Sequence, residues 1–506
     1  MKHVVVIGGG HSGLVAAVRL AVAGLEVTVL EHAAHPGGAV STKELTLPGF
    51  LHDAGAGFFP QTLASPAFAR LPNVIGAVDW VNPKVPLAHP FLDGSAIALH
   101  RDVESTVASL DLASGAGDAW RTLMARLLPH QNVLCRTALS RLPPLWSGMS
   151  VALRLRRDAV ELARRMLGSG ASFGRDLFGA EKAAAWFAGP VIHSDLSPGA
   201  AGGGALAFFL LFLGHAVGWP YPRGGAARLS DALTAELESL GGRVRCCAPA
   251  ERIVSRKGRV HAVQIASGEE LACDAVVAAI SASPLARMLP DDALPERLLS
   301  RLSRWRYGLG AFKLDWALAG PVPWTSEEAR RAGVVHLGDK LEALFAAAHE
   351  AGAGRVPAAP TLVVGQHSLH DPSRAPAGQH TLYAYTHLSQ RPELSDDEIA
   401  DRVEERIEAF APGFRDLVLA RACRSPRALE RDNPSMVGGD LGGGSFELDQ
   451  QFVFRPAPEL CRYRTPLRGL YLAGSSTHPG PGVHGVSGDG AASALLADRS
   501  RLRFWR

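Results

Sequence analysis

The fold is decided by residues 4–31, which read VVVIGGGHSGLVAAVRLAVAGLEVTVLE. Residues 4–7 are β-branched throughout, as is typical of a strand that is buried on both faces. Residues 14–23 are rich in alanine, valine and leucine, and Gly24 follows them as a typical helix C-cap. Residues 27–30 then form a second strand. A strand, a helix and a strand within about thirty residues predict a parallel sheet.

Three glycines at the first turn, Gly8, Gly10 and Gly13, form the pattern GxGxxG between the predicted strand and the predicted helix. The first glycine permits the tight turn, the second lets backbone N–H groups approach a pyrophosphate, and the third lets the helix pack on the strand. Glu31, at the end of the second strand, can accept hydrogen bonds from ribose hydroxyls. Together with Ser12 in the same turn, these residues predict a dinucleotide-binding site.

The composition is that of an ordinary globular protein. The chain has 506 residues, of which 47% are hydrophobic, and 52 basic against 49 acidic side chains leave a net charge of +3. Its mean hydropathy is +0.07. This length leaves room for about three domains, and the composition excludes a disordered or coiled-coil chain. So small a basic excess does not indicate a nucleic-acid partner.

The six cysteines show neither CxxC pairs nor the spacing of metal ligands, so we expect reduced thiols and no metal site. The apolar run in MKHVVVIGGG is too short for a signal peptide. No later apolar run reaches the roughly 18 residues that indicate a membrane span. A cytoplasmic location is therefore expected.

Three stretches carry a resemblance to a known family. They read EHAAHPGG at 31–38, YPRGG at 221–225 and GLYLAGSSTHPGPGVHGV at 469–486. They are similar to the E…PGG, YPxGG and LYLxGxxTHPGxGxxG segments of FAD enzymes in the amine oxidase superfamily of two-dinucleotide-binding-domain flavoproteins. Within it, the chain most resembles phytoene desaturases and phytoene-dehydrogenase-related oxidoreductases. The order and spacing of the stretches agree with that family, while residues 76–218 resemble it only weakly.

The resemblance implies an α/β fold with a Rossmann-like FAD-binding domain, discontinuous in sequence, and an α+β substrate-binding domain. The FAD-binding domain would comprise residues 1–75, 219–290 and 431–506. A helical substrate region would occupy residues 76–218, and the substrate-binding domain would occupy residues 291–430.

The resemblance also implies how FAD is held. The first glycine motif, Glu31 and His32 would hold the ADP half, and Ala250 would touch adenine. The loop that follows His32 would lie along the pyrophosphate and the ribityl chain through Gly37, Gly38 and Ala39. The C-terminal run would surround the isoalloxazine through Gly474, Ser475, Gly485 and Val486. Ser475 stands where many relatives carry an acid.

Candidate side chains for the chemistry are few. His484, in the C-terminal run, is the expected acid or base beside the flavin, with a wall-lining histidine as the alternative. Trp219 and Tyr221 are predicted to contact the substrate. The apolar run 208–213 could line a tunnel or form ordinary helix core. The glycines of residues 438–444 indicate either a close approach of backbone to a ligand or a flexible loop.

From the resemblance we expect an FAD-dependent oxidoreductase that transfers hydride between flavin N5 and a C–C bond of an apolar substrate, in a desaturation, saturation or isomerisation. One alternative is a C–N oxidising amine oxidase, with Trp219 and Tyr221 in an aromatic cage. Another is a flavin-binding interaction protein without turnover. Because no second GxGxxG follows a strand, we expect dioxygen or a quinone as the electron acceptor rather than a nicotinamide nucleotide.

Two basic segments bear on partners. Residues 120–170 contain nine arginines against two acids on periodic leucine, methionine and alanine, which predicts amphipathic helices. The tail is also basic and aromatic. Either these arginines form a solvated face, or they hold the protein at the periphery of an anionic membrane. The tail residues concerned are Arg499, Arg501, Arg503, Phe504, Trp505 and Arg506.

Overall fold

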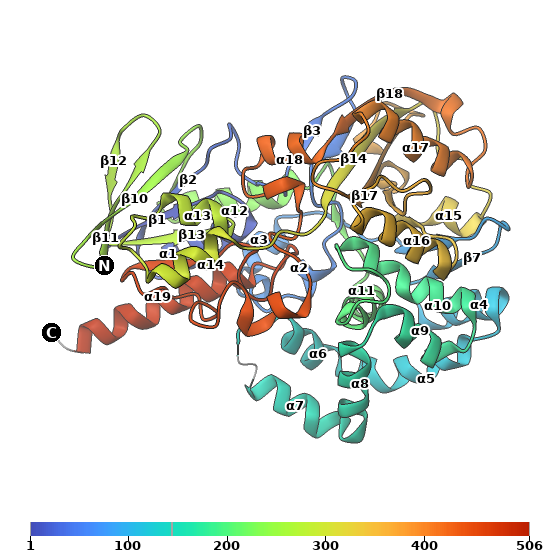
Figure 1. Ribbon diagram of the computed structural model, residues 1–506, viewed down its shortest axis with the longest axis horizontal. Coiled ribbons are helices and arrows are strands. Elements are labelled where there is room, and N and C mark those ends of the chain that lie inside the picture. The colour runs from blue at the N-terminus through green and yellow to red at the C-terminus, as the bar shows by residue number, and fades with distance from the viewer. Residues whose placement is uncertain (1, 143–144, 505–506) are drawn as a thin grey trace.

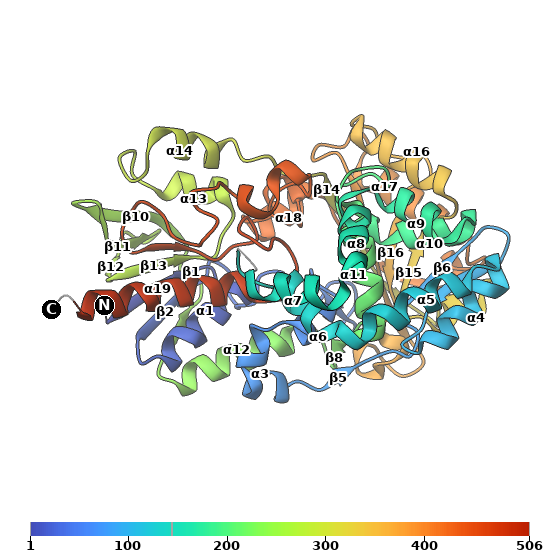
Figure 2. The same ribbon diagram turned by 90° about the horizontal axis from the view of Figure 1, so that it is seen from below.

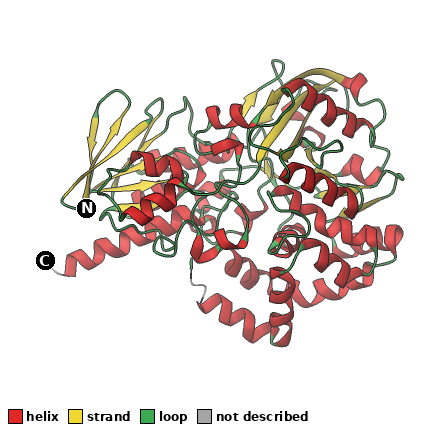
Figure 3. Cartoon of the chain, viewed as in Figure 1, coloured by secondary structure: helices red, strands yellow, loops and turns green. Residues whose placement is uncertain are grey.

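The computed structural model describes residues 2–142 and 145–504. The chain forms two lobes that lie side by side, and both termini belong to the same lobe (Figure 1). Strands gather in two places, one in each lobe, and helices surround them (Figure 3). The predicted α/β fold is confirmed, because each lobe is a sheet covered by helices.

A parallel sheet forms the centre of the lobe that holds the termini. Its strands lie in the order β19-β13-β1-β2-β9, and every neighbouring pair is parallel. The sheet therefore joins three stretches of chain that are distant in sequence. The bounds are β1 His3–Ile7, β2 Glu26–Leu30, β9 Arg243–Arg245, β13 Ala275–Ala278 and β19 Leu470–Leu472.

Both faces of this sheet are covered, as the β-branched run of β1 predicts. Val4 and Val6 pack on one face against α1 (His11–Val22), α12 (Ala227–Ser239) and α19 (Val486–Phe504). Val5 and Ile7 pack on the other face, under α13 (Ala282–Met288), α14 (Glu296–Ser303) and a small antiparallel sheet. Figure 2 shows α13 and α14 on the side of the sheet opposite α1 and α12. Each fully buried aliphatic side chain contributes about 1.5–3 kcal/mol to folding. The small sheet comprises β10 Ala250–Arg256, β11 Arg259–Ile265 and β12 Glu270–Ala272.

The other lobe contains a mostly antiparallel sheet in the order β18-β14-β17-β16-β15-β6-β7, in which only β15 and β6 run parallel among the described strands. Two strands correct the expectation that residues 76–218 are helical, since β6 and β7 come from that region. Both are four-residue runs buried almost throughout, and such runs show no alternation by which a strand could be recognised. The bounds are β6 Leu87–Pro90, β7 Ala96–Leu99, β14 Gly310–Leu318, β15 Val334–Leu337, β16 Leu362–Gly365, β17 His380–Leu388 and β18 Val418–Arg424.

Helices cover this second sheet and extend beyond it. The predicted amphipathic helices of the arginine-rich stretch are present as α5 to α8, and α7 and α8 lie at the lower edge of the molecule in Figure 1. The bounds are α4 Val103–Ser114, α5 Gly117–Leu127, α6 Gln131–Ala138, α7 Leu145–Leu155, α8 Arg157–Leu167, α9 Gly170–Phe178, α10 Glu181–Ala188, α11 Gly203–Ala216, α15 Glu327–Arg331, α16 Leu341–Gly352, α17 Asp396–Glu408 and α18 Pro426–Asp432.

Short elements connect the lobes. The hairpin of β3 and β4 lies beside β17, and the two-residue strands β5 and β8 pair with each other. The helix α2 contacts α11 and α6, and α3 contacts α12. The bounds are β3 Thr42–Glu44, β4 Leu51–Asp53, β5 Trp80–Val81, β8 Tyr221–Pro222, α2 Pro60–Ala64 and α3 Pro72–Gly76.

Candidate active site

A cavity of about 870 Å³ runs between the two lobes. One end begins at the glycine turn after β1, and the other end meets α11, β14 and β17 of the second lobe. Parallel sheets bind their ligands outside the carboxyl ends of the strands, which is where this cavity opens. The predicted site residues that line it are Gly8, Gly10, Ser12, Gly13, Glu31, His32, Gly38, Ala39, Trp219, Ala250, Gly474 and Ser475.

The glycine turn has the geometry that a pyrophosphate requires. Gly10 is the N-cap of α1 and makes no side-chain cap, so the N–H groups of the first helical turn are directed at the cavity. A Cβ at Gly10 would meet only the carbonyl oxygen of Gly37, at 4.0 Å. At Gly13 a Cβ would instead press into the carbonyl oxygen of Gly8. The second glycine thus leaves space for a ligand, and the third brings helix and strand together.

Glu31 is held as an ionised acceptor. Its Oε2 accepts the N–H of Gly9 at 2.8 Å, and its Oε1 accepts the N–H of Ala33 at 2.9 Å. Burial opposes ionisation, but hydrogen bonds from His32, Ala33 and Gly9 outweigh it and hold the pKa of Glu31 below its ordinary value. The hydrogen bond to Glu31 raises the pKa of His32 in turn. This carboxylate suits ribose hydroxyls and repels a phosphate.

The loop after β2 supports this site from behind. The N–H of Gly37 donates to the carbonyl oxygen of Gly9 at 2.8 Å, and Gly37 has φ +128°, which favours glycine. Gly37 therefore shapes the turn, while its neighbours Gly38 and Ala39 line the cavity.

In the C-terminal run, the residues that line the cavity lie a few positions before those predicted from the sequence. Pro481, Gly482 and Val483 line it, whereas Gly485 and Val486 are not among the lining residues. A Cβ at Gly485 would meet Val15 and Phe68, so this glycine packs the run against α1 and the segment after α2. Val486 begins α19 and packs against Ala67 and Leu139. The reason is a turn at Gly482, where φ is +120° and the chain leaves the cavity.

Both ring nitrogens of His484 form hydrogen bonds with the backbone of its own loop. The N–H of Val486 donates to its Nδ1 at 3.1 Å, so its Nε2 carries the hydrogen and donates to the carbonyl oxygen of Gly480, also at 3.1 Å. Burial, and then the neighbouring His11, lower the pKa of His484 to about 3. The geometry therefore favours a structural role for His484 over the expected acid–base role.

Of the two predicted substrate residues, one lines the cavity and the other does not. Trp219 lies in the cavity wall, with its indole N–H donating to the carbonyl oxygen of Leu210 at 3.1 Å. Tyr221 is fully buried and is not among the lining residues. Its hydroxyl donates to the carbonyl oxygen of His367 at 2.9 Å, and its ring lies 5.9 Å from the guanidinium carbon of Arg374. An aromatic cage of these two side chains is thus not formed.

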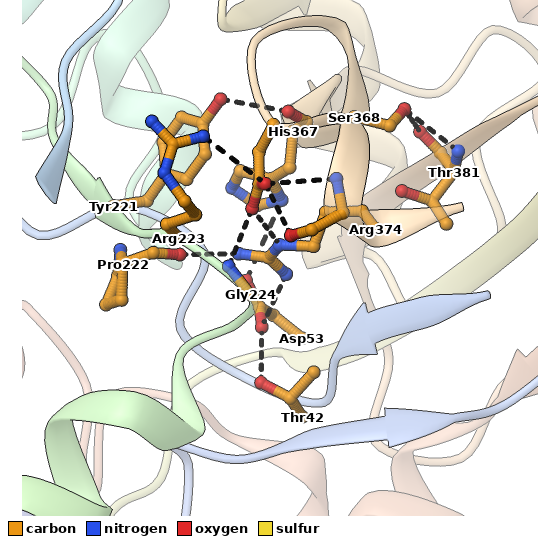
Figure 4. A network of polar contacts seen from close by, with 12 residues as sticks. Thr42, Asp53, Tyr221, Pro222, Arg223, Gly224, His367, Ser368, Arg374 and Thr381 are labelled. Carbon is orange, nitrogen blue, oxygen red and sulfur yellow. Dashed lines mark hydrogen bonds and ion pairs between the residues drawn. The ribbon is translucent and has the colours of Figure 1, made fainter. Parts of the chain in front are cut away.

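Tyr221 instead belongs to a buried polar junction between the lobes (Figure 4). Arg374 pairs with Asp53 of β4 at 3.0 Å and with Asp371 at 2.9 Å, and it donates to the carbonyl oxygen of Pro222 at 3.0 Å. Burial opposes the ionisation of Asp53, but the attraction of Arg374 and the hydrogen bonds from Ala226 and Thr42 together lower its pKa. These charges come from segments that are far apart in the sequence, so no local pattern revealed them.

Lys313 is a candidate site residue that the sequence reasoning missed. It lies on β14, lines the cavity and is almost fully buried. Its ammonium forms an ion pair with Asp315 and lies 4.9 Å from the centre of the Tyr383 ring. Burial lowers the pKa of Lys313 to about 8, against the attraction of Asp315. A lysine that titrates near neutral pH can hold or release a proton in the cavity. A signal was available, because Lys313 interrupts the apolar run of β14.

The glycine-rich segment 438–444 is a loop that buried hydrogen bonds keep in one conformation. The carboxylate of Asp440 accepts the N–H groups of Gly308, Gly442 and Gly444 at 2.6–3.1 Å. Arg455, fully buried, donates to the carbonyl oxygens of Gly442 at 2.7 Å and of Ser475 at 2.9 Å. These bonds favour the expected approach of backbone to a ligand over a flexible loop. Leu441, Gly443 and Phe446 line the cavity.

Comparison with known proteins agrees with this geometry. Residues 11–496 match the family described as flavin containing amine oxidoreductase, and the chain belongs to that family. It is 28% identical to pyridine nucleotide-disulfide oxidoreductase domain-containing protein 2 of Rattus norvegicus, over 98% of this chain and 94% of the relative. It is 29% identical to the hydroxyneurosporene desaturase of Cereibacter sphaeroides, over 98% of each chain.

Solved structures show the same fold. An oxidoreductase from Methanosarcina mazei superposes with a TM-score of 0.64 at 16% identity, over 98% of this chain and all of the other. A putrescine oxidase superposes with a TM-score of 0.60 at 16% identity, over 99% of both chains. The predicted membership of the amine oxidase superfamily is thereby confirmed. The protein is a flavin oxidoreductase, and the α1 turn and Glu31 fit FAD as its cofactor.

Proposed function

We propose that this flavin enzyme transfers hydride between FAD and a C–C bond of an apolar substrate. The observation that carries the proposal is one continuous cavity that joins the nucleotide site to an apolar wall in the second lobe. Leu206 and Leu210 of α11 contribute to that wall together with Trp219, Phe58 and Phe446. The named activities of the relatives, hydroxyneurosporene desaturase and phytoene dehydrogenase, support the choice of an alkyl or polyene substrate.

The chain's own residues bind and orient the reactants. The N-terminus of α1 would hold the pyrophosphate, Glu31 the ribose and Ala250 the adenine, and residues 481–483 and Lys313 would then line the flavin end of the cavity. Bound FAD supplies the two-electron chemistry of the reaction. The apolar wall excludes water and positions the substrate. The lysine amine, with its lowered pKa, is placed to hold a proton near the reacting carbons.

A second candidate is oxidation of an amine at a C–N bond. The aromatic side chains of Trp219, Tyr383 and Tyr385 in the cavity favour it, because aromatic faces attract amines. The cationic Lys313 beside Tyr383 opposes it, because a second cation would be repelled.

The test is anaerobic mixing of the yellow protein with candidate substrates. Bleaching of the flavin by a carotenoid polyene or another alkyl substrate supports the proposal, and bleaching by an amine supports the second candidate. No bleaching by any of these substrates, in protein with a full complement of FAD, argues for the interaction protein without turnover.

We also propose that a diffusible acceptor, dioxygen or a quinone, reoxidises the flavin. The single glycine motif after a strand supports this, since a nicotinamide nucleotide would need a second site. Rapid reduction of the flavin by NADH or NADPH would overturn the idea.

Peripheral contact with an anionic membrane is a further part of the proposal. None of the described helices is both long enough and apolar enough to cross a bilayer. On α7 and α8, however, Leu153 is 72% exposed and Val160 is 74% exposed, next to exposed arginines such as Arg154 and Arg164. Apolar side chains among arginines suit the interface of an anionic bilayer. In the basic tail, Trp505 and Arg506 lie outside the described residues.

Co-sedimentation with phosphatidylglycerol vesicles tests this contact. The double substitution Leu153→Asp and Val160→Asp should abolish salt-sensitive binding, because it places carboxylates on the docking face. The matched control is Leu112→Asp on α4, since Leu112 is also highly exposed but lies outside the arginine-rich helices. Equal sedimentation of the double variant and the wild type would contradict the proposal.

A further inference from the structure

A chain of polar side chains leads from the cavity into the antiparallel sheet. Tyr385 of β17 and His193, at the end of the 3-10 helix η3 (Gly189–His193), both line the cavity. The Tyr385 hydroxyl lies 2.8 Å from Nδ1 of His193, and Nε2 of His193 lies 2.8 Å from Nε2 of His336 on β15. His89 of β6 lies next to His336, and both rings approach the position that a Cβ at Gly189 would occupy. Nothing in the proposed chemistry uses these side chains.

The three histidines of this series, His193, His336 and His89, are neutral near neutral pH. Burial lowers the pKa of His193 to about 3 and of His89 to about 4, and it lowers the pKa of His336 well below its ordinary value. Each ring therefore has one N–H donor and one nitrogen lone pair. No group of three or more His, Cys, Asp or Glu side chains in residues 2–142 and 145–504 could hold a metal ion.

The tautomer of His89 follows from its partner. Nε2 of His89 lies 2.7 Å from the carbonyl oxygen of Asp339, and a carbonyl can only accept. Nε2 of His89 must therefore carry the hydrogen, and its Nδ1 must present a lone pair. That Nδ1 is buried and has no hydrogen-bond partner among the described residues.

Nδ1 of His336 is also buried without a partner in the described part of the chain, and it faces the same small space. A methyl carbon at Gly189 would lie 3.0 Å from Nδ1 of His89 and 3.4 Å from Nδ1 of His336. Two lone pairs that face each other in a buried space repel, whereas an N–H facing a lone pair is attracted. The stable arrangement has the hydrogen of His336 on Nδ1.

This arrangement sets the direction of the whole chain. With its hydrogen on Nδ1, His336 can only accept at Nε2, so Nε2–H of His193 donates to it. Nδ1 of His193 then carries a lone pair and accepts the hydroxyl hydrogen of Tyr385. The Tyr385 oxygen has only lone pairs left for the cavity. The Tyr385 oxygen is therefore a hydrogen-bond acceptor, and this direction is set by His89, three side chains away.

We propose that Tyr385 selects, among apolar ligands of this cavity, those that carry an alcohol hydroxyl. The hydroxyl hydrogen of the ligand donates to the Tyr385 oxygen, while the rest of the ligand lies on the apolar wall of Leu210 and Trp219. An ammonium group would also donate, but Lys313 already places a cation in the same cavity. This inference rests on the proposed function for the cavity being a substrate site, and it adds the class of substrate.

The test compares two isomers, n-octanol and heptyl methyl ether, in calorimetric titrations of the oxidised FAD-bound enzyme. They have the same atoms, but only the alcohol donates a hydrogen bond. We expect the wild type to bind n-octanol about three- to tenfold more tightly than the ether, as one neutral hydrogen bond provides. Tyr385→Phe should remove this preference, because it lowers the affinity for n-octanol and leaves the affinity for the ether unchanged. Trp219→Phe, the matched change in the apolar wall, should lower the affinity for both ligands by the same factor.

Gly189→Ala tests the direction of the chain. Gly189 has φ −47° and ψ −48°, so alanine fits its backbone, but the methyl group separates the two Nδ1 atoms. The chain then loses its preferred direction, and the preference for n-octanol should shrink towards one. Nitrogen NMR of histidine-labelled enzyme gives an independent measurement, in which Nδ1 of His193 should have the shift of an unprotonated nitrogen.

Equal affinity of the wild type for the two isomers overturns the inference, as does a protonated Nδ1 on neutral His193 or a failure of n-octanol to bind. These measurements need no turnover. If the alcohol preference is found but no alkyl substrate bleaches the flavin, the proposed function fails and the role of Tyr385 stands.

Discussion

The two halves of the central cavity are built in different ways. The cofactor half consists largely of backbone, namely the glycine turn, the first turn of α1 and the loop at Gly38. The substrate half consists of side chains such as Trp219, Lys313 and Tyr385, which come from a loop and two strands.

The difference teaches where sequence patterns are informative. A site made of backbone needs glycine at fixed positions, because any side chain would fill the space or distort the turn. A wall made of side chains needs only that suitable residues meet in space, and many arrangements of the chain achieve this. The first kind of site is visible as a motif, and the second is not.

The substitution Gly10→Val should have the largest effect and would break the cofactor half. The side chain would occupy the open space at the N-terminus of α1, so the folded protein should lose its FAD completely. Flavin released by denaturation and chromatography measures the content. The control is Gly76→Ala in α3, where a Cβ meets nothing within 4 Å. Undiminished FAD in folded Gly10→Val protein would refute the assignment.

Arg374→Met should destabilise the junction behind the substrate half. It leaves the carboxylates of Asp53 and Asp371 buried without their cation, which costs about 3–5 kcal/mol of unfolding free energy. Urea denaturation of the FAD-bound protein measures the loss. Arg245→Met is the matched control, because the pair of Arg245 with Glu269 is solvent-exposed and lies outside the junction, so its loss should cost far less. A loss as small as that of the control would contradict the structural role of the junction.

The third-largest expected effect is a loss of folding stability in acid, caused by buried histidines of the substrate half. Burial lowers the pKa of His193 to about 3, and of His89 and His367 to about 4, from an ordinary 6.5. The unfolded chain therefore binds protons at a higher pH than the native state, and stability falls as the pH drops below 6.5 towards these native values. Each such histidine contributes up to about 2 kcal/mol of this loss by about pH 5.

The melting temperature between pH 7 and pH 5 measures the acid effect, and carboxylates contribute little in that window because they titrate lower. His367→Asn removes one of these groups and should lose less stability over the same range than the wild type. A melting temperature that is flat between pH 7 and pH 5 would count against burial of neutral histidines.

The smallest effect concerns Lys313, at the boundary of the two halves. Its pKa of about 8 predicts a small shift of the flavin absorption bands with a midpoint near that pH, because the charge beside the cofactor changes. Lys313→Met should abolish the shift. If the wild-type spectrum does not change between pH 7 and pH 9, Lys313 does not titrate within reach of the flavin.

The sequence by itself determined the parallel sheet, the glycine turn and the family. It did so because these features depend on local patterns: β-branched residues in β1, glycines spaced along a turn, and Glu31 at the end of β2. The same reasoning placed the C-terminal run beside the flavin, although residues 481–483 rather than Gly485 and Val486 line the cavity.

Only the tertiary structure decided which side chains face the cavity. Tyr221 and His484 are buried in structural contacts, whereas Lys313 and Tyr385 reach the cavity because β14 and β17 pair in a register that opposes these two residues. Such pairings join positions that are far apart in the chain, so no local spacing encodes them. The direction of the histidine chain depends in the same way on His89, which β6 brings to Gly189.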